Sequence, residues 1–293
     1  MTDSSPGEAG PPRVSRNQDP RSPSPETARA GGADAPLDDG RQTAVRVVEL
    51  TRDFPGGVRA LEGVSFDVPA GELTSIIGPS GCGKTTTLKA MAGLLEPTAG
   101  QVIVQGRVVQ GPGPERAFVF QDFALIPWAT VLRNVAFGLE LRGVPRAERE
   151  DVAREYIAKT NLTSFEDAYP HQLSGGMRQR VGLARALAVD ADILLMDEPF
   201  ASVDEQIRRK FQEDLLILLS DERKTVVFVT HSIEEAAYVS DQIVILTRGP
   251  GRVSKVVRPQ IERGGSSDEI RRSPAYLDCV ETIWSELRGY LEA

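Results

Sequence analysis

The chain has little cysteine and no long apolar run, and each shortage removes a class of protein. Its 293 residues include only Cys82 and Cys279, far apart in the sequence and without a C-x-x-C or histidine pairing. Neither a structural metal site nor a disulfide framework is indicated, and this usage fits a reducing cytoplasm. The apolar run from Leu215 to Leu219 is far shorter than the roughly 20 residues that cross a bilayer. We therefore expect a chain that is soluble or docks on a separate membrane protein.

Basic side chains are also fewer than acidic ones. Lysine and arginine together number 34 against 42 acidic residues, which gives a formal net charge of -8. Binding to nucleic acid relies first on basic side chains that neutralise phosphates. Nucleic acid is therefore not an expected partner.

Large apolar side chains are scarce in residues 1–43, which are rich in Pro, Ser, Gly, Ala and Asp. Such a stretch cannot bury enough surface to offset the entropy lost on ordering. It also lacks the continuous apolar core of a signal peptide. We predict a disordered N-terminal tail over residues 1–43.

Residues 44–250 have the pattern of one α/β domain that begins with short strands. Early strands are expected at 45–50, 64–68, 73–77 and 101–104, and buried ones at 193–196, 225–229 and 242–246. The buried strands are apolar on both faces and alternate with helical stretches, as in a parallel sheet. Between about residues 122 and 172 no convincing strand occurs, whereas 131–141 and 146–159 have helical periodicity. This part is predicted to be a helical insertion.

Residues 78–85 form a phosphate-binding motif. Their sequence, Gly-Pro-Ser-Gly-Cys-Gly-Lys-Thr, fits the pattern G-x-x-x-x-G-K-[ST] and lies between a predicted strand and a predicted helix. The backbone amides would surround phosphate oxygens, Lys84 would reach the β- and γ-phosphates, and Thr85 would hold Mg²⁺. A glycine-rich turn that merely fits the pattern is the alternative. The predicted nucleotide-binding residues of this loop are Gly78, Pro79, Ser80, Gly81, Cys82, Gly83, Lys84, Thr85 and Thr86.

A second possible anion-binding turn follows the helical insertion. Ser174 is a good N-cap, and apolar residues recur at helical spacing behind it. The Ser174 hydroxyl and the amides of Gly175 and Gly176 would then gather at a helix N-terminus, which favours anions. Because the first loop already holds one set of phosphates, this turn suggests use on the nucleotide of another chain. An ordinary capped helix is the alternative.

With these motifs in this order, residues 44–250 resemble the ATP-binding subunits of ABC transporters. The resemblance implies a P-loop NTPase core of RecA-like type, with an antiparallel β subdomain and a helical ABC-specific insertion. Phe54 is similar to the aromatic residue that stacks on adenine, for which the family often has Tyr; a core Phe is the alternative. Gln121 matches the glutamine that touches Mg²⁺ and the attacking water. Asp204 matches the residue of the loop at the dimer seam, although it could instead cap a helix.

The same resemblance gives roles to two acids and a histidine. Asp197 and Glu198 follow the apolar run Ile193 to Met196, where Asp197 would join the Mg²⁺ shell and Glu198 would orient water as the base. A solvated acidic pair is the alternative. His231 follows a predicted strand and matches the histidine that contacts the γ-phosphate, whereas a purely structural histidine is the other interpretation. Glu198, His231, Lys84 and Gln121 are thus the expected catalytic residues.

The resemblance also implies partners. Two such subunits, a homodimer in the simplest case, would face head to tail with ATP between one phosphate loop and the other chain's Ser174 turn. Met177 stands where the family usually has Gln, a change expected to adjust the interface and leave ATP use intact. Transmembrane permease subunits, and through them an extracytoplasmic substrate-binding protein, would complete an importer on the cytoplasmic face of the membrane.

A finer resemblance is to the nitrate, sulfonate and taurine import branch. It rests on the runs Leu125 to Val131 and Asn134 to Leu139, on Arg248 to Arg252 and on the C-terminal tail. Trp128 lies in a predicted loop and suggests an interaction surface, with the core of the insertion as the alternative. An ABC transporter for another substrate stays open. A DNA-repair or chromosome-organising ATPase would have a long coiled coil between Gln121 and Ser174, where this chain has about fifty residues without heptads. A ribosome-binding factor would carry two such cassettes in one chain, whereas this sequence has one set of motifs.

Residues 251–293 are expected to be a C-terminal extension that ends in an amphipathic helix. Ser273 and Pro274 form a cap and first-turn pair. The apolar stripe of this helix is predicted to consist of Leu277, Val280, Trp284, Leu287 and Leu291.

Overall fold

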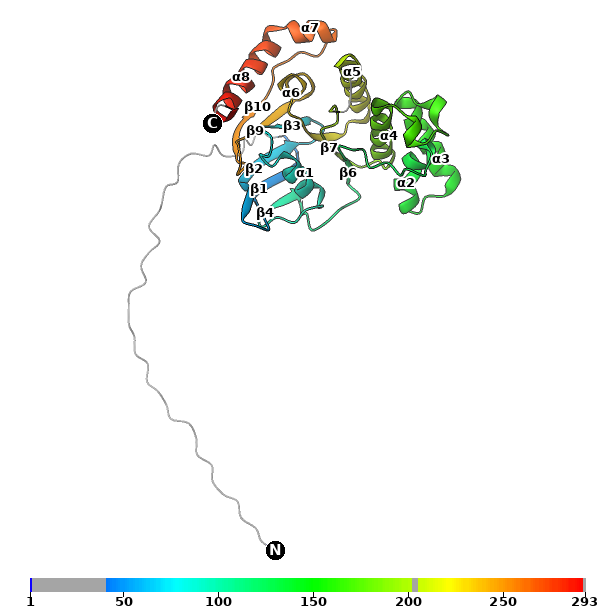
Figure 1. Ribbon diagram of the computed structural model, residues 1–293, viewed down its shortest axis with the longest axis horizontal. Helices are drawn as coiled ribbons and strands as arrows, with labels where there is room; N and C mark the ends of the chain where they lie inside the picture. Colours follow the sequence, from blue (N-terminus) through cyan, green and yellow to red (C-terminus); the bar gives the residue numbers. More distant parts are fainter. Residues whose placement is uncertain (2–40, 202–204, 292–293) are drawn as a thin grey trace, which may run out of the picture. The chain divides into compact units, whose positions relative to one another are not determined.

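Two β-sheets form the framework of the protein (Figure 1), whose computed structural model describes Met1 and residues 41–201 and 205–291. Contacts group the described residues from Arg41 onward into one unit. The predicted tail falls almost wholly outside the described residues, although Thr43 is already the first residue of a strand. No helix among the described residues is long and apolar enough to cross a membrane.

The larger sheet has six strands in the order β10-β9-β3-β8-β7-β6. Neighbours from β9 to β6 run parallel, whereas β10 pairs antiparallel with β9 at one edge. The strands are β3 (Leu73–Ile77), β6 (Arg116–Val119), β7 (Ile193–Asp197), β8 (Thr225–Val229), β9 (Gln242–Leu246) and β10 (Val253–Val257). Strand β10, which the sequence pattern did not reveal, carries the sheet past residue 250.

The smaller sheet is antiparallel and comes from the N-terminal part of the chain. Its order is β2-β1-β4-β5, formed by β1 (Thr43–Phe54), β2 (Val58–Pro69), β4 (Ala99–Val104) and β5 (Arg107–Val108). Buried residues of β1, β2 and β4 alternate with exposed or half-buried ones over much of each strand, as expected for a sheet with one covered face.

The buried strands of the larger sheet divide their side chains between two cores. In β7, Ile193 and Leu195 pack with the smaller sheet and with helix α1 (Lys84–Ala92), whereas Leu194 and Met196 pack with the helices on the other face. Successive side chains of a strand point to opposite faces. This explains why these strands are apolar throughout.

Helices fill the region between β6 and β7. These are α2 (Val131–Leu141), α3 (Arg146–Lys159), the short 3₁₀ turns η1 (Thr163–Phe165) and η2 (Pro170–Gln172), and α4 (Gly175–Ala188). Helices α2 and α3 both pack on α4 (Figure 1), and α4 contacts β6. The insertion is thereby attached to the sheet through α4.

The C-terminal part of the chain adds further helices. They are α5 (Glu205–Glu222), α6 (Ile233–Val239), α7 (Ser267–Arg272) and α8 (Pro274–Leu291), and α8 contacts α6 (Figure 1). The predicted cap at Ser273 is confirmed, because its hydroxyl accepts the amide of Tyr276 at 3.3 Å.

The predicted apolar stripe of α8 was partly wrong. The helix buries Tyr276, Cys279, Ile283 and Leu287 in the core, with Val280 half-buried, whereas Leu277 and Trp284 are exposed. Both sets recur at helical spacing, so periodicity alone could not choose between the two faces. The contacts made with α6 and β9 decide which face is buried.

Candidate functional site

The candidate residues meet at the carboxyl ends of four neighbouring strands. The phosphate loop follows β3, Gln121 follows β6, Glu198 follows β7, and His231 follows β8. Because these strands are parallel neighbours, their ends lie at the same edge of the sheet. In open α/β sheets, ligands bind at this edge.

The phosphate loop needs its glycines because other parts of the chain approach it closely. Gly83 has a φ of +95°, and a Cβ there would lie 2.4 Å from Cδ2 of Leu61. At Gly78 a Cβ would lie 2.7 Å from the carbonyl oxygen of Leu246. Larger residues would therefore displace the loop. Lys84 begins α1 directly after Gly83, and its buried Nζ donates to the carbonyl oxygens of Gly78 and Pro79 at 2.8 and 3.1 Å.

Thr85 and Asp197 face each other across the site. The Thr85 hydroxyl donates to Oδ1 of Asp197 at 2.8 Å, although 112 residues separate them in the sequence. Burial raises the pKa of the Asp197 carboxyl, the Thr85 hydrogen bond opposes that shift, and the charge of Glu198 adds to it. A buried carboxylate with a second acid beside it is poorly stabilised by the protein alone. The set of hydroxyl and carboxylate oxygens fits a hard divalent cation such as Mg²⁺.

Glu198 is the centre of a second cluster. Its Oε2 accepts from Nε2 of Gln121 at 3.0 Å and lies 3.6 Å from Nδ1 of His231, whose side chain is 65% exposed. Glu198 has a φ of +47°, the left-handed region that non-glycine residues rarely adopt, and its amide donates to the carbonyl of Val229 on β8. Such strain persists only where the surroundings hold it, and it clusters at functional sites.

Phe54 lies at the end of β1, half-buried, with the guanidinium carbon of Arg52 5.0 Å from its ring centroid. Adenine stacking would need one free face of this ring. Its role stays a prediction.

Ser174 lies at the start of α4, where its hydroxyl makes a local contact. Its hydroxyl accepts the amide of Met177 at 3.3 Å, so the predicted N-cap is confirmed. Gly175 and Gly176 form the first turn of α4 and are half-buried. Within residues 41–201 and 205–291, no hydrogen bond or ion pair joins this turn to the phosphate loop. Asp204, the remaining predicted site residue, lies outside the described residues.

A loop that the sequence did not assign to the site packs on the phosphate loop. The amide of Gly251 donates to the carbonyl of Ala60 at 2.9 Å, and its own carbonyl accepts from Glu62 at 3.0 Å. A Cβ on Gly251 would lie 2.0 Å from the carbonyl oxygen of Cys82. Only glycine fits this approach. The two glycines of the run Arg248 to Arg252 were the available signal.

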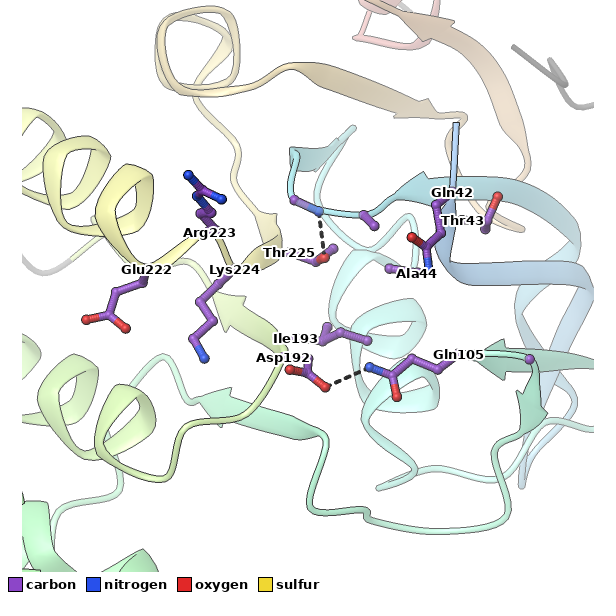
Figure 2. Close-up of a pocket in the computed structure, with 13 residues that line it drawn as sticks. Gln42, Thr43, Ala44, Gln105, Asp192, Ile193, Glu222, Arg223, Lys224 and Thr225 are labelled. Carbon is purple, nitrogen blue, oxygen red and sulfur yellow. Dashed lines mark hydrogen bonds between the residues drawn. The ribbon is translucent and has the colours of Figure 1, made fainter. Parts of the chain in front are cut away.

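A cavity of about 520 Å³ lies at the opposite edge of the sheet, and Figure 2 shows the residues that line it. It is lined by the first residues of β7 and β8, Ile193 and Thr225, and by Gln42 of the approach to β1. Two charged groups at its wall already have partners, since Lys224 pairs with Asp190 and Glu222 pairs with Lys159. This cavity is separate from the phosphate loop, which follows the carboxyl end of β3.

The phosphate loop, the acids after β7 and the histidine after β8 together define a P-loop nucleotide hydrolase. The sequence profile of the ABC transporter family matches residues 61–201. An uncharacterized ABC transporter ATP-binding protein of Methanocaldococcus jannaschii is 50% identical over 228 residues, which cover 77% of this chain and 85% of that protein. A taurine import ATP-binding protein of Chromobacterium violaceum is 46% identical over 239 residues, 80% of this chain and 92% of that protein.

The solved structures agree. A dimeric post-hydrolysis state of an ATP-binding cassette, bound to ADP and phosphate, is 33% identical with a TM-score of 0.64 and covers 73% of this chain and 98% of that one. The chain belongs to the ABC transporter family, as one of its ATP-binding ATPases. The expected fold class, a P-loop NTPase core with its antiparallel sheet and helical insertion, is confirmed.

Proposed function

We propose that this chain is the ATP-hydrolysing subunit of an importer for a small anion, of the class that includes taurine, other sulfonates and nitrate. The observation that carries the ATPase part is the convergence of Lys84, the Thr85–Asp197 pair and the Glu198 cluster on one sheet edge. The substrate class is supported by relatives named as taurine import ATP-binding proteins, at 44 to 46% identity.

In hydrolysis, Glu198 orients the attacking water and accepts its proton, while Gln121 holds the Glu198 carboxylate in place. Lys84 exchanges its bonds to Gly78 and Pro79 for phosphate oxygens and stabilises the charge on the transferring phosphoryl group, together with His231. Thr85 and Asp197 would hold Mg²⁺, with Gln121 beside them. When bound there, this ion neutralises charge on the β- and γ-phosphates.

The Ser174 turn acts on the nucleotide of a second copy. Support comes from its lack of contact with the phosphate loop within the described residues and from the exposed Ser174 side chain. An exposed helix N-terminus with a serine hydroxyl and glycine amides suits a γ-phosphate presented from outside. Related cassettes of known structure are dimeric.

The helical insertion carries the surface for the membrane subunits. Trp128 is 79% exposed, and Leu141 and Phe137 of α2 are also exposed large apolar residues. A large contiguous patch of exposed apolar side chains marks an interaction site, and we propose that these residues contribute to one. Docking there would place this chain on the cytoplasmic face of the membrane, with the substrate-binding protein on the other side.

The proposal is tested by uptake in a strain that lacks this gene. We expect loss of uptake of radiolabelled taurine, or of another sulfonate or nitrate, and restoration by the wild-type gene. A gene encoding Glu198→Gln, a variant expected to fold but not to hydrolyse ATP, should not restore uptake. Restoration by that variant would contradict the ATPase role, and unchanged uptake of all these anions in the deletion strain would contradict the substrate class.

A further inference from the structure

Glu235 is a buried carboxylate in the first turn of α6 that the proposed hydrolysis does not use. The residue is only 7% exposed and lies four positions after His231. A carboxylate out of water costs free energy unless it is paired or hydrogen-bonded. Its contacts therefore reveal what it stabilises. Its Oε2 accepts the hydroxyl hydrogen of Thr230, and its Oε1 lies 3.7 Å from Nε of Arg208.

The Thr230 hydroxyl fixes the backbone on both sides of His231. It donates to Glu235, and it accepts the amide hydrogen of Ser232 at 3.1 Å. Thr230 itself is buried. Its amide donates to the carbonyl of Ile76 at 3.3 Å, and Ile76 belongs to β3, the strand before the phosphate loop. The His231 side chain has little packing of its own, because it is 65% exposed. Its direction towards Glu198 therefore depends on these neighbouring bonds.

Arg208 connects the same network to α5. It lies in the first turns of that helix, which begins at Glu205, a few residues beyond Ala201. The amide of Ala201 in turn donates to the carbonyl of Glu198 at 3.2 Å. Polar contacts therefore link α5 to the loop that presents His231. They run from Arg208 to Glu235, from Glu235 to Thr230, and from Thr230 to the amide of Ser232.

We propose that Glu235, acting through the Thr230 hydroxyl, is a positioning residue for His231. It holds the imidazole where it meets the γ-phosphate, and its pairing with Arg208 makes the His231 loop move with α5. The inference rests on the proposed role of His231 in hydrolysis. Because a displacement of a reacting group by about 1 Å can lower a rate about 10²-fold, loss of this support should appear in kcat.

The test is a double-mutant cycle between Thr230 and His231 on the full chain, with ATP turnover measured well below the melting temperature of every variant. Valine has the shape of threonine without its hydroxyl, so Thr230→Val should lower kcat roughly tenfold while KM for ATP changes less than about twofold. Thr230→Ser keeps the hydroxyl and should restore most of the loss. In a chain that already carries His231→Ala, adding Thr230→Val should have no further effect, since residues that act as one unit are not additive.

A second pair of variants tests the arm to Arg208. Glu235→Gln keeps an acceptor for Thr230 but removes the charge that faces Arg208, and it should lower kcat roughly threefold. Glu234→Gln is the matched control, because Glu234 lies in the same turn but is exposed. Its kcat should equal that of the wild type.

The outcomes separate this inference from the proposed function. If His231→Ala lowers kcat but Thr230→Val does not, the positioning role is wrong and the ATPase proposal stands. The same conclusion follows if the double variant loses kcat by the product of the two single losses. Equal losses in Glu235→Gln and Glu234→Gln would also overturn it. If His231→Ala retains the wild-type kcat, the proposed role of His231 fails and this inference fails with it.

Discussion

The phosphate loop and the Ser174 turn both place backbone amides at a helix N-terminus, but their surroundings differ. The phosphate loop is enclosed by its own chain: Lys84 is buried, Leu246 and Gly251 pack on the loop, and Thr85 is bonded to Asp197. In the part of the chain that the structure describes, the Ser174 turn has only the local bonds of a capped helix, and its hydroxyl side chain is exposed. Two anion-binding ends of similar local chemistry therefore differ in what completes them. The first is completed by the fold, and the second is, in the proposed function, completed by a partner.

Glu198→Gln gives the largest expected effect and tests whether the enclosed site is complete. The variant keeps the shape and the contact with Gln121 but loses the base, so turnover should fall by at least about 10²-fold. ATP binding should persist, and the ATP-bound dimer should accumulate. Size-exclusion chromatography with ATP and Mg²⁺, alongside phosphate release, makes the measurement. A monomer with undiminished turnover would contradict the assignment.

Ser174→Ala and Lys84→Ala separate the two anion-binding ends. Loss of one hydrogen-bond donor to transition-state charge typically costs about 10²-fold in kcat, which is the expected loss for Ser174→Ala. ATP affinity of the monomer, measured by fluorescence titration at low protein concentration, should stay unchanged. Lys84→Ala should weaken that affinity. If Ser174→Ala weakened it equally, the Ser174 turn would belong to the same nucleotide site.

Trp128→Ala tests the helical insertion, which lies apart from both ends. The exposed Trp128 has few contacts to lose within the chain, so ATP turnover of the isolated subunit should stay within about twofold of the wild type. Uptake in cells should fall about tenfold, since a buried aromatic anchor in an interface is worth about 2 kcal/mol or more. Val58→Ala, another exposed apolar residue but on β2, is the control and should leave uptake unchanged. Equal uptake by both variants would remove Trp128 from the interface.

Asp197→Asn gives the smallest expected effect, a change in melting temperature, and it tests the electrostatics of the enclosed site. Burial raises the pKa of Asp197, so the folded chain binds a proton more readily than the unfolded chain, and stability falls as the pH rises above the ordinary value of 3.8. At neutral pH the ligand-free variant should therefore melt at a higher temperature than the wild type. That difference should shrink as the pH is lowered towards 3.8.

Calorimetry with and without Mg²⁺ and ATP makes the measurement for Asp197→Asn. A ligand that binds only the folded state raises its stability. Because Asp197 would hold Mg²⁺, the wild-type protein should gain more stability from the ligands than the variant. A variant that melts lower at neutral pH without ligand would show that the Asp197 charge is already compensated.

Much of the site could be predicted because its residues belong to short local motifs. The glycine spacing of residues 78–85 predicts the phosphate loop, and Asp197 and Glu198 are recognisable as two acids that follow four apolar residues. The strand and helix that flank the phosphate loop were recognisable because hydrophobic periodicity is local. The predicted helices at 131–141 and 146–159 coincide with α2 and α3 for the same reason.

Other features had no local signal. Nothing in the sequence around Glu198 predicts a positive φ, since the backbone is held there by its bond to Val229 on a neighbouring strand. The buried pairing of Glu235 with Thr230 and Arg208 depends on how α5 and α6 pack. Helix α8 offers two apolar stripes, and the sequence favoured one that includes the exposed Leu277 and Trp284.

The sequence by itself determined the chemical groups of this protein, their order and the alternation of strands and helices, because these follow from residue types and short-range spacing. Only the tertiary structure decided that four strand ends meet at one edge, that Gly251 packs on the phosphate loop, and which face of α8 is buried. Those features depend on contacts between residues far apart in the chain, which local periodicity does not encode. The phosphate loop and the Ser174 turn are alike in their local sequence pattern and differ in their long-range contacts.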